Sequence, residues 1–133
     1  MASKVPKPYN GGQWTAARYR SFIISILRAG SRKWPQKYEA LKRALIGKRL
    51  DTKTGKMSNR YKCAACSNLF KADQVQVDHI QPVVDVNDGF VDWNTYIARM
   101  YPEADGFQIL CSECHSVKTQ NERKSRKENA SKD

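Results

Sequence analysis

Long apolar segments and export signals are missing from this chain of 133 residues. No uninterrupted apolar run approaches the roughly 18 residues that a membrane-spanning helix requires, so the sequence predicts no membrane association. The first eight residues, Met-Ala-Ser-Lys-Val-Pro-Lys-Pro, lack the apolar core that directs secretion. We therefore expect an intracellular, cytoplasmic protein.

Histidine and cysteine are scarce, and they are confined to one part of the chain. The two histidines and four cysteines all lie between residues 63 and 115. These side chains are the ones best suited to binding metals. In a chain without an export signal, the cysteines favour thiolates on a metal ion over disulfides.

Acidic residues are nearly absent from the first half of the chain. Residues 1–62 carry 16 Lys and Arg against two Asp and Glu, whereas residues 63–115 carry two against eight. Residues 116–133 are basic again, and the whole chain has a formal net charge of +11. This segregation favours a polyanion, double-stranded DNA, as partner over a merely solubilising surface.

The basic front end predicts helices. Residues 1–12 contain prolines and glycines and predict an extended, mobile arm, and residues 13–60 form a basic helical region that ends in a loop. We expect one helix over residues 13–28, a second from Trp34 to a stop at Gly47, and a basic loop over 51–60. The apolar positions predict one buried face on each helix, comprising Tyr19, Phe22, Ile23, Ile26 and Leu27 on the first and Tyr38, Leu41 and Leu45 on the second. The cations expected to contact DNA are Lys42, Arg43, Lys48 and Arg49.

The cysteines form two Cys-x-x-Cys pairs, Cys63 with Cys66 and Cys111 with Cys114. A two-residue spacer lets both thiolates of a pair reach one tetrahedral ion, so the two pairs predict a closed, structural Zn²⁺ site. A redox Cys-x-x-Cys is disfavoured by the second copy and by the lack of a surrounding βαβ pattern. Four free buried thiols are disfavoured by the paired spacing.

The segment between the pairs carries acid and imidazole groups at the ends of predicted elements. Residues 74–77 alternate polar and apolar, which predicts a strand ending at Asp78 and His79, and residues 107–110 can pair with it. A helix after Cys114 would hold His115 opposite that end. Asp78 and His115 together can hold one divalent ion. In isolation, an Asp-His pair is usually a turn, and His115 could be an extra zinc ligand.

Three motifs in this order resemble the HNH nucleases. They are Cys-x-x-Cys at 63–66, Val-Asp-His-Ile-x-Pro at 77–82 and Leu-Cys-x-x-Cys-His-x-x-Lys-Thr at 110–119. Trp14-Thr-Ala-Ala-Arg through Trp34 also resembles the N-terminal part of such enzymes from tailed phages. The resemblance implies a ββα-metal core over residues 61–124. The polar composition of residues 125–133 predicts a frayed tail.

The resemblance also implies roles for individual residues. His79 would be the general base, and Asp78 and His115 would hold a catalytic divalent cation, Mg²⁺ or Mn²⁺. Lys118 would join the DNA-contacting cations. The protein would be a metal-dependent DNA endonuclease of a phage, acting in the bacterial host, with phage packaging proteins as further partners.

One position departs from the family pattern. The asparagine that steadies the base histidine usually precedes the second strand, where this chain has Gly106. Asn94 is an asparagine that can substitute, Asn87 is another, and a backbone carbonyl can also orient the ring. Both asparagines lie in an insert over residues 83–101. We expect a helix there over 92–100, with Trp93, Ile97 and Met100 buried.

The sequence thus predicts an α+β fold, in which two basic helices precede a zinc-stapled core. Two other functions remain open at this point. One is a zinc-dependent DNA-binding module without catalysis, and the other is a protein-interaction module of a phage packaging or replication assembly. Asp78 and His79 distinguish the enzyme from both, because binding alone requires neither.

Overall fold

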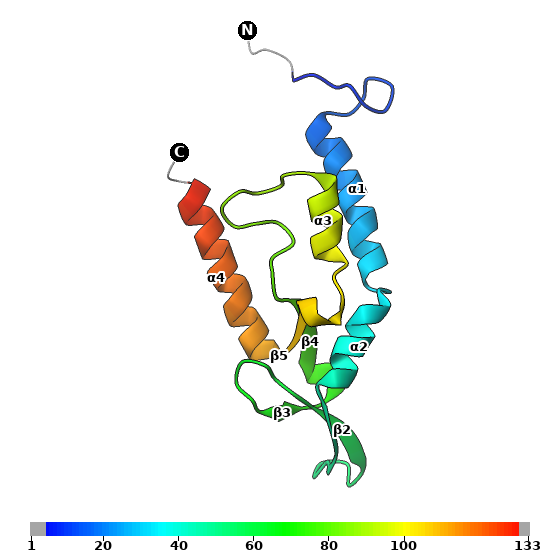
Figure 1. Cartoon of the computed structure of the whole chain (residues 1–133), viewed down its shortest axis with the longest axis vertical. Helices are drawn as coiled ribbons and strands as arrows, with labels where there is room; N and C mark the ends of the chain where they lie inside the picture. The colour runs from blue at the N-terminus through cyan, green and yellow to red at the C-terminus, as the bar shows by residue number, and fades with distance from the viewer. Residues whose placement is uncertain (1–4, 131–133) are drawn as a thin grey trace. The chain divides into compact units, whose positions relative to one another are not determined.

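A computed structural model describes residues 5–130, which form an α+β protein with four α-helices and two small sheets (Figure 1). The chain divides into two compact units, residues 1–33 and residues 34–133. No helix in the described range combines the length and the apolar character needed to cross a membrane.

The first unit consists of a turn and helix α1 (Ala16–Ser31). Thr15 caps the helix, since its side chain accepts a hydrogen bond from the Arg18 backbone N–H over 3.2 Å. The expectation of an extended arm is wrong for the stretch from Tyr9 to Trp14, which closes as a turn. Residues 1–4 of that arm lie outside the described residues.

The predicted apolar stripe on α1 is only partly covered. Phe22 and Ile26 are exposed, contrary to expectation. The aromatic side chains contact one another instead, with the ring of Trp14 5.2 Å from that of Phe22 and the ring of Tyr9 stacked on Tyr19. The amphipathic pattern therefore predicted the helix correctly, but part of its apolar stripe is exposed.

The second unit begins with helix α2 (Pro35–Arg43), which is shorter than predicted. The chain turns at Ala44 into strand β1 (Leu45–Leu50), which pairs antiparallel with β2 (Met57–Lys62), and β3 (Leu69–Phe70) pairs with the end of β2. The prediction of a helix reaching Gly47 is therefore wrong, and the loop predicted over 51–60 is confirmed only for residues 51–56, because β2 begins at Met57. Gly47 lies at a bulge with a φ of 137°, a conformation that disfavours other residues.

The burial predicted for α2 holds in part for Leu41, which is half-buried, but is wrong for Tyr38 and Leu45. Tyr38 is 63% exposed and Leu45 39%, whereas Ala40 is the buried residue of the helix. Ala40 packs with Ala104 and Phe107, and Trp34 lies against the same cluster. The small Ala40 side chain lets α2 approach the sheet closely, which a bulkier side chain would prevent.

The central element is a two-stranded antiparallel sheet of β4 (Val75–His79) and β5 (Phe107–Cys111). Short 3-10 helices, η1 (Ala72–Gln74) and η2 (Ala104–Gly106), precede the two strands. Both strands confirm the sequence prediction, including their pairing. Residues of α2 pack on this sheet, and α4 (Ser112–Ala130) continues directly from β5 and also lies against it.

Helix α4 extends further than expected. The tail predicted over residues 125–133 is helical as far as Ala130, and residues 131–133 lie outside the described range. Side-chain hydrogen bonds hold its second half to the 84–87 loop: Arg126 donates to the Val84 carbonyl and Asn129 to the Val86 carbonyl.

Helix α3 (Trp93–Met100) confirms the helix predicted in the insert. Asp92 caps it by accepting a hydrogen bond from the Thr95 backbone N–H over 2.7 Å. Its buried side chains are Tyr96 and Met100, four residues apart, whereas Ile97 is 43% exposed. Of the residues predicted to be buried, Met100 is buried and Trp93 is half-buried, so the prediction is wrong for Ile97, and the adjacent Tyr96 is buried instead.

Candidate metal centre and the residues around it

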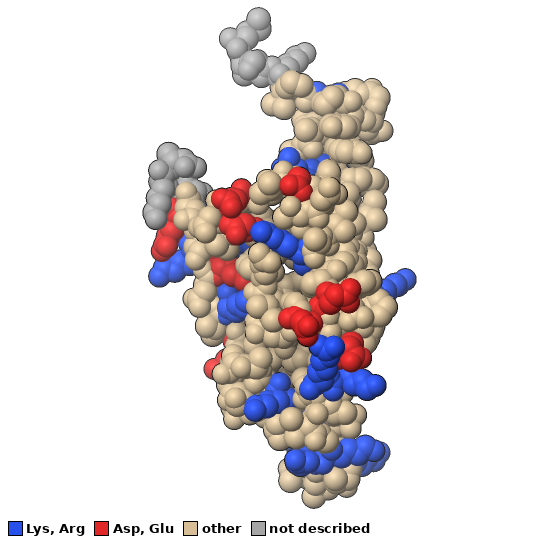
Figure 2. Space-filling model, viewed as in Figure 1, with Lys and Arg blue, Asp and Glu red and all other residues tan. Residues whose placement is uncertain are grey.

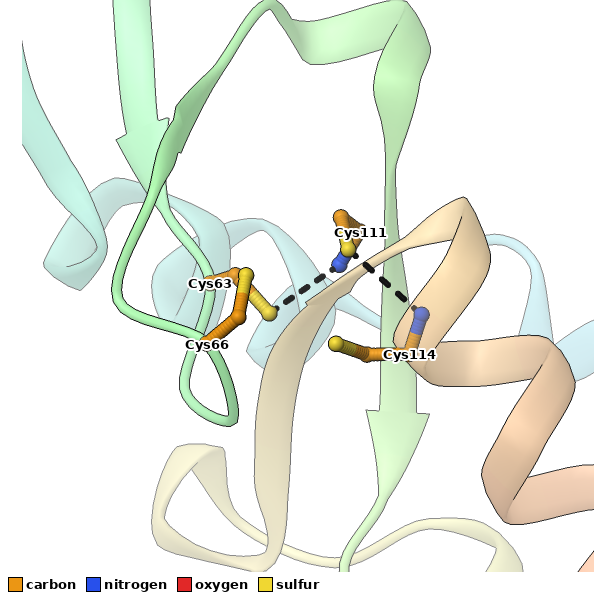
Figure 3. Close-up of side chains that lie close together, drawn as sticks. All are labelled: Cys63, Cys66, Cys111 and Cys114. Atoms are coloured by element: carbon orange, nitrogen blue, oxygen red, sulfur yellow. Dashed lines mark hydrogen bonds between the residues drawn. The ribbon is translucent and has the colours of Figure 1, made fainter.

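Four cysteines from three elements converge at one point (Figure 3). Cys63 follows β2 directly, Cys66 lies in the next turn, Cys111 ends β5 and Cys114 is in the first turn of α4. Their sulfur atoms all lie within 4.8 Å of one another. Four sulfurs at about 2.3 Å from a tetrahedral ion are about 3.8 Å apart, so this set can hold a metal such as zinc.

Backbone N–H groups are directed at these sulfurs. The Cys111 N–H donates to Cys63 Sγ over 3.4 Å, and the Cys114 N–H donates to Cys111 Sγ over 3.5 Å. A tight turn brings Cys66 back to Cys63, because Ser67 adopts a positive φ of 64° and its N–H donates to the Cys63 carbonyl. These donors stabilise negative charge on sulfur.

The pKa values of Cys63 and Cys114 are shifted in opposite directions. Burial alone raises the pKa of Cys63, but backbone N–H groups of Cys66, Cys111 and Ala65 outweigh it and lower the pKa to about 6. The neighbouring Cys111 thiol and burial raise the pKa of Cys114 to about 12. A thiolate therefore forms easily at Cys63, whereas the neighbouring thiols oppose ionisation of Cys114. A bound cation removes that opposition.

Asp78 is the best-connected side chain near the end of β4. Its Oδ2 accepts hydrogen bonds from Gln108 Nε2 over 3.0 Å and from Lys118 Nζ over 2.6 Å. Its Oδ1 lies 3.7 Å from His115 Nε2. Gln108 is opposite Asp78 in the sheet register, and His115 and Lys118 project from α4.

His79 belongs to a different environment from its neighbour. Its Nε2 lies 2.9 Å from the Met100 carbonyl, at the C-terminus of α3, and its ring lies 4.9 Å from that of Phe107. Successive strand residues face opposite sides of a sheet, which explains the separation from Asp78. Among the described residues, no hydrogen bond or ion pair joins the His79 ring to His115 or to the Asp78 carboxylate.

Burial lowers the pKa of His79 below its ordinary value, and the positive charges of Lys37 and Lys118 act in the same direction. The Met100 carbonyl and the Asp78 carboxylate oppose this shift without reversing it. The ring is therefore neutral at physiological pH. A carbonyl only accepts hydrogen bonds, so the network assigns the ring proton to Nε2 and leaves a lone pair on Nδ1.

The candidates for the missing asparagine have other positions. Asn94 is exposed on α3, and the His79 ring is held by the Met100 carbonyl instead of by Asn94. Asn87 accepts a hydrogen bond from Asn129 in the loop beside α4. The glycine at 106 has a steric reason, because a Cβ there would lie 2.6 Å from Pro102 Cβ.

The five cations predicted to contact DNA differ in their surroundings. Lys118 is bound to Asp78, to the His79 carbonyl and to Glu122. Arg43 is paired with Asp105 over 2.7 Å and with Glu39 over 3.5 Å. Lys42 is exposed on α2, and Lys48 and Arg49 are exposed on β1.

Sequence reasoning missed Gln108, and it considered a backbone carbonyl as the partner of the His79 ring without identifying Met100 as its source. There was a weak indication of Gln108 in the sequence, because it is the polar residue in the apolar run of β5. The residue paired with it on β4, Asp78, lies on the same face of the sheet. Nothing in the sequence indicated the Met100 carbonyl, because every residue has a carbonyl.

Comparison of the chain with protein-family models, with curated proteins and with solved structures finds no match. What is established is therefore the α+β fold and a four-cysteine cluster that can hold a metal ion.

Proposed function

We propose that the chain is a metal-dependent DNA endonuclease of the HNH type. The observation that carries the proposal is the approach of His115 Nε2 to within 3.7 Å of Asp78 Oδ1, from a helix that starts inside the four-cysteine cluster. The order of β4, β5 and α4 as strand, strand and helix supports the same assignment.

The four cysteines would hold a structural Zn²⁺. All four positions of a tetrahedral ion would be occupied by sulfur, which leaves none for water and so disfavours catalysis at this ion. Its task would be to join the turn after β2, the end of β5 and the start of α4. That junction fixes the first turn of α4 and hence the position of His115 relative to Asp78.

Asp78 and His115 would hold the catalytic divalent cation. Asp78 Oδ2 is already occupied by Gln108 and Lys118, so Oδ1 and His115 Nε2 are the two atoms available to it. A divalent cation bound there would neutralise charge that develops on the phosphate and on the leaving oxygen. Gln108 and Lys118 orient the carboxylate from its other side.

His79 would be the general base. A neutral ring with Nε2–H donated to the Met100 carbonyl presents Nδ1 as the atom that can accept a proton from water. The lowered pKa keeps that atom unprotonated at neutral pH. Asp78 and His79 diverge at the end of β4, which suits in-line hydrolysis, because the attacking water and the leaving oxygen lie on opposite sides of phosphorus.

The experiment that tests this proposal is the cleavage of supercoiled plasmid by purified protein with added Mg²⁺ or Mn²⁺. We expect nicked or linear product, and we expect a chelator to stop the reaction while the cysteine-bound zinc, measured separately, is still present. Asp78→Ala and His115→Ala should be inactive at low divalent concentration and partly recover at high concentration, because each removes one ligand and leaves another. A matched control is Asp105→Ala, which removes an exposed carboxylate paired with Arg43 and should cut normally.

A wild-type protein that binds plasmid tightly but leaves it intact with every divalent ion would contradict the proposal. It would support the non-catalytic DNA-binding module instead.

A further inference from the structure

The β1–β2 hairpin concentrates positive charge that, among residues 5–130, is not offset by ion pairs to acidic side chains. Residues 45–62 contain six Lys and Arg and one acidic residue, Asp51. Asp51 is buried, accepts a hydrogen bond from the Lys53 backbone N–H and is paired with Lys71 from outside the hairpin. In Figure 2 the hairpin end of this unit shows Lys and Arg side chains, and the visible Asp and Glu side chains lie away from it.

None of these six cations forms an ion pair among residues 5–130. They are Lys48, Arg49, Lys53, Lys56, Arg60 and Lys62. Arg43 and Lys118, in contrast, are already bound to carboxylates. A cation already paired with an acid releases less free energy on meeting a phosphate, so the hairpin is the better-prepared anion-binding surface.

The register divides the hairpin into two unlike faces. Arg49 is opposite Ser58 and Gly47 is opposite Arg60, so both arginines lie on one face, and Lys62 follows two residues after Arg60 on the same side. The other face carries Leu50 opposite Met57, together with Lys48 opposite Asn59. The face that carries Arg49, Arg60 and Lys62 is called the arginine face below.

The arginine face is held in place by local hydrogen bonds. Arg60 donates to the Ser58 and Asn59 carbonyls and to the Ser58 hydroxyl, and Arg49 donates to the Lys48 carbonyl over 2.9 Å. Gly47, opposite Arg60, has no side chain to cover the guanidinium. Each arginine has five N–H donors, so several remain available to a ligand.

We infer that the arginine face of the β1–β2 hairpin is a DNA-binding arm that grips the phosphate backbone of the duplex. The inference rests on the proposed function, since it takes DNA as the substrate and names the surface that holds it. A two-stranded ribbon is narrow enough to enter the major groove, and guanidinium groups match phosphate oxygens in pairs.

The arm is attached to the cysteine cluster. Cys63 follows Lys62 at the end of β2, and the Lys62 backbone N–H donates to the Ala44 carbonyl at the start of β1 over 3.0 Å. The base of the hairpin and the first turn of α4 are thus both fixed near the four sulfurs. Binding through the arm would hold the duplex at a constant position relative to Asp78 and His115.

The test is the salt dependence of binding to a short duplex, measured without added Mg²⁺ or Mn²⁺ so that no cleavage occurs. Arg49→Ala combined with Arg60→Ala should reduce the slope of log affinity against log salt by about 1.8, because each lost phosphate contact contributes about 0.9. A change in slope of this size corresponds to a roughly 30-fold loss of affinity at about 0.15 M salt. The matched control is Lys124→Ala combined with Lys127→Ala, two exposed cations on α4 that lower the net charge equally.

The control should bind within about twofold of wild type and keep its slope. Zinc content and far-UV circular dichroism of all variants should equal those of wild type, which separates lost contacts from lost folding. Equal affinities for the arginine variant and wild type, or an equal loss in the α4 control, would overturn the inference. Tighter binding of wild type to a single-stranded or duplex RNA of the same length would overturn the choice of DNA.

Failure of the proposed function gives a different result. If Arg49→Ala combined with Arg60→Ala weakens duplex binding but the wild-type protein never cleaves DNA, the DNA-binding arm is supported and the endonuclease proposal is refuted.

Discussion

Removal of one cysteine ligand should unfold the second unit. We choose Cys63→Ala, because Cys63 is fully buried and packs with Leu110 and Cys111 in one of the two apolar clusters identified in the described residues. The large side chains buried in that range are few, namely Tyr96, Met100, Phe107, Ile109 and Leu110. At about 1.5–3 kcal/mol each, their burial contributes about 8–15 kcal/mol.

A four-thiolate zinc site contributes about as much, since binding free energies for structural Zn²⁺ in small domains are about 10–16 kcal/mol. This exceeds or equals the whole net stability of most domains, about 5–15 kcal/mol. Loss of the ion should therefore be decisive, whereas a purely apolar Cys→Ala change would cost only about 1–2 kcal/mol.

The assay combines metal content with amide hydrogen exchange. Wild type should carry about one zinc per chain, and the β4 and β5 amides should be protected. Cys63→Ala should carry almost none and lose that protection. The control is Ser112→Ala, a neighbour of Cys111 whose hydroxyl donates only to the Gln74 carbonyl over 3.3 Å, and which should keep both. A zinc-free Cys63→Ala protein with wild-type exchange protection would refute this reasoning.

Two further results follow from the structure. The cleavage rate should rise with pH through an apparent pKa below 6.5, because burial lowers the pKa of His79 and the base acts unprotonated. A pH–rate profile under saturating DNA checks this prediction. A midpoint above 6.5 would contradict it. Gly106→Ala should destabilise the second unit by about 1–3 kcal/mol, because its Cβ would lie 2.6 Å from Pro102 Cβ. Urea denaturation measures the change, and a stability equal to wild type would show that the η2 turn relaxes freely.

The parts of this molecule that the sequence could predict are those with a local or spaced pattern. The two Cys-x-x-Cys pairs predicted a four-sulfur cluster because spacing alone lets each pair reach one ion. The alternation before Asp78 and the apolar run before Cys111 predicted β4, β5 and their pairing. Asp92 before an apolar-periodic segment marked the start of α3.

The incorrect secondary-structure predictions arose where a helical pattern and a strand pattern overlap. Leu41 and Leu45 are four residues apart, which extends the helical pattern of α2 beyond its end at Arg43. The strand signal that competes with it is short and broken by the bulge at Gly47, so β1 was overlooked. A helical period can also place a face one residue away from the true one, as with Ile97 and Tyr96 in α3.

The positions that orient the chemistry were the least predictable. His79 is held by a backbone carbonyl at the C-terminus of α3, an arrangement that depends on how the insert folds back on β4. The ion pair of Lys118 with Asp78 was not predicted, because it joins α4 to the end of β4 across the face of the sheet. Long-range geometry of this kind has no signature in a single sequence.

The measurement that tests the central claim most directly is the cleavage rate of His79→Ala beside that of wild type, with zinc content and duplex affinity measured on the same samples. Deleting the proton acceptor should reduce the rate by about 10²–10⁴-fold. Zinc content and duplex affinity should stay unchanged, because His79 is not one of the four cysteines that would hold zinc and its neutral ring would not attract phosphate. A His79→Ala protein that cleaves at the wild-type rate would contradict the assignment of the general base and, with it, the proposed mechanism.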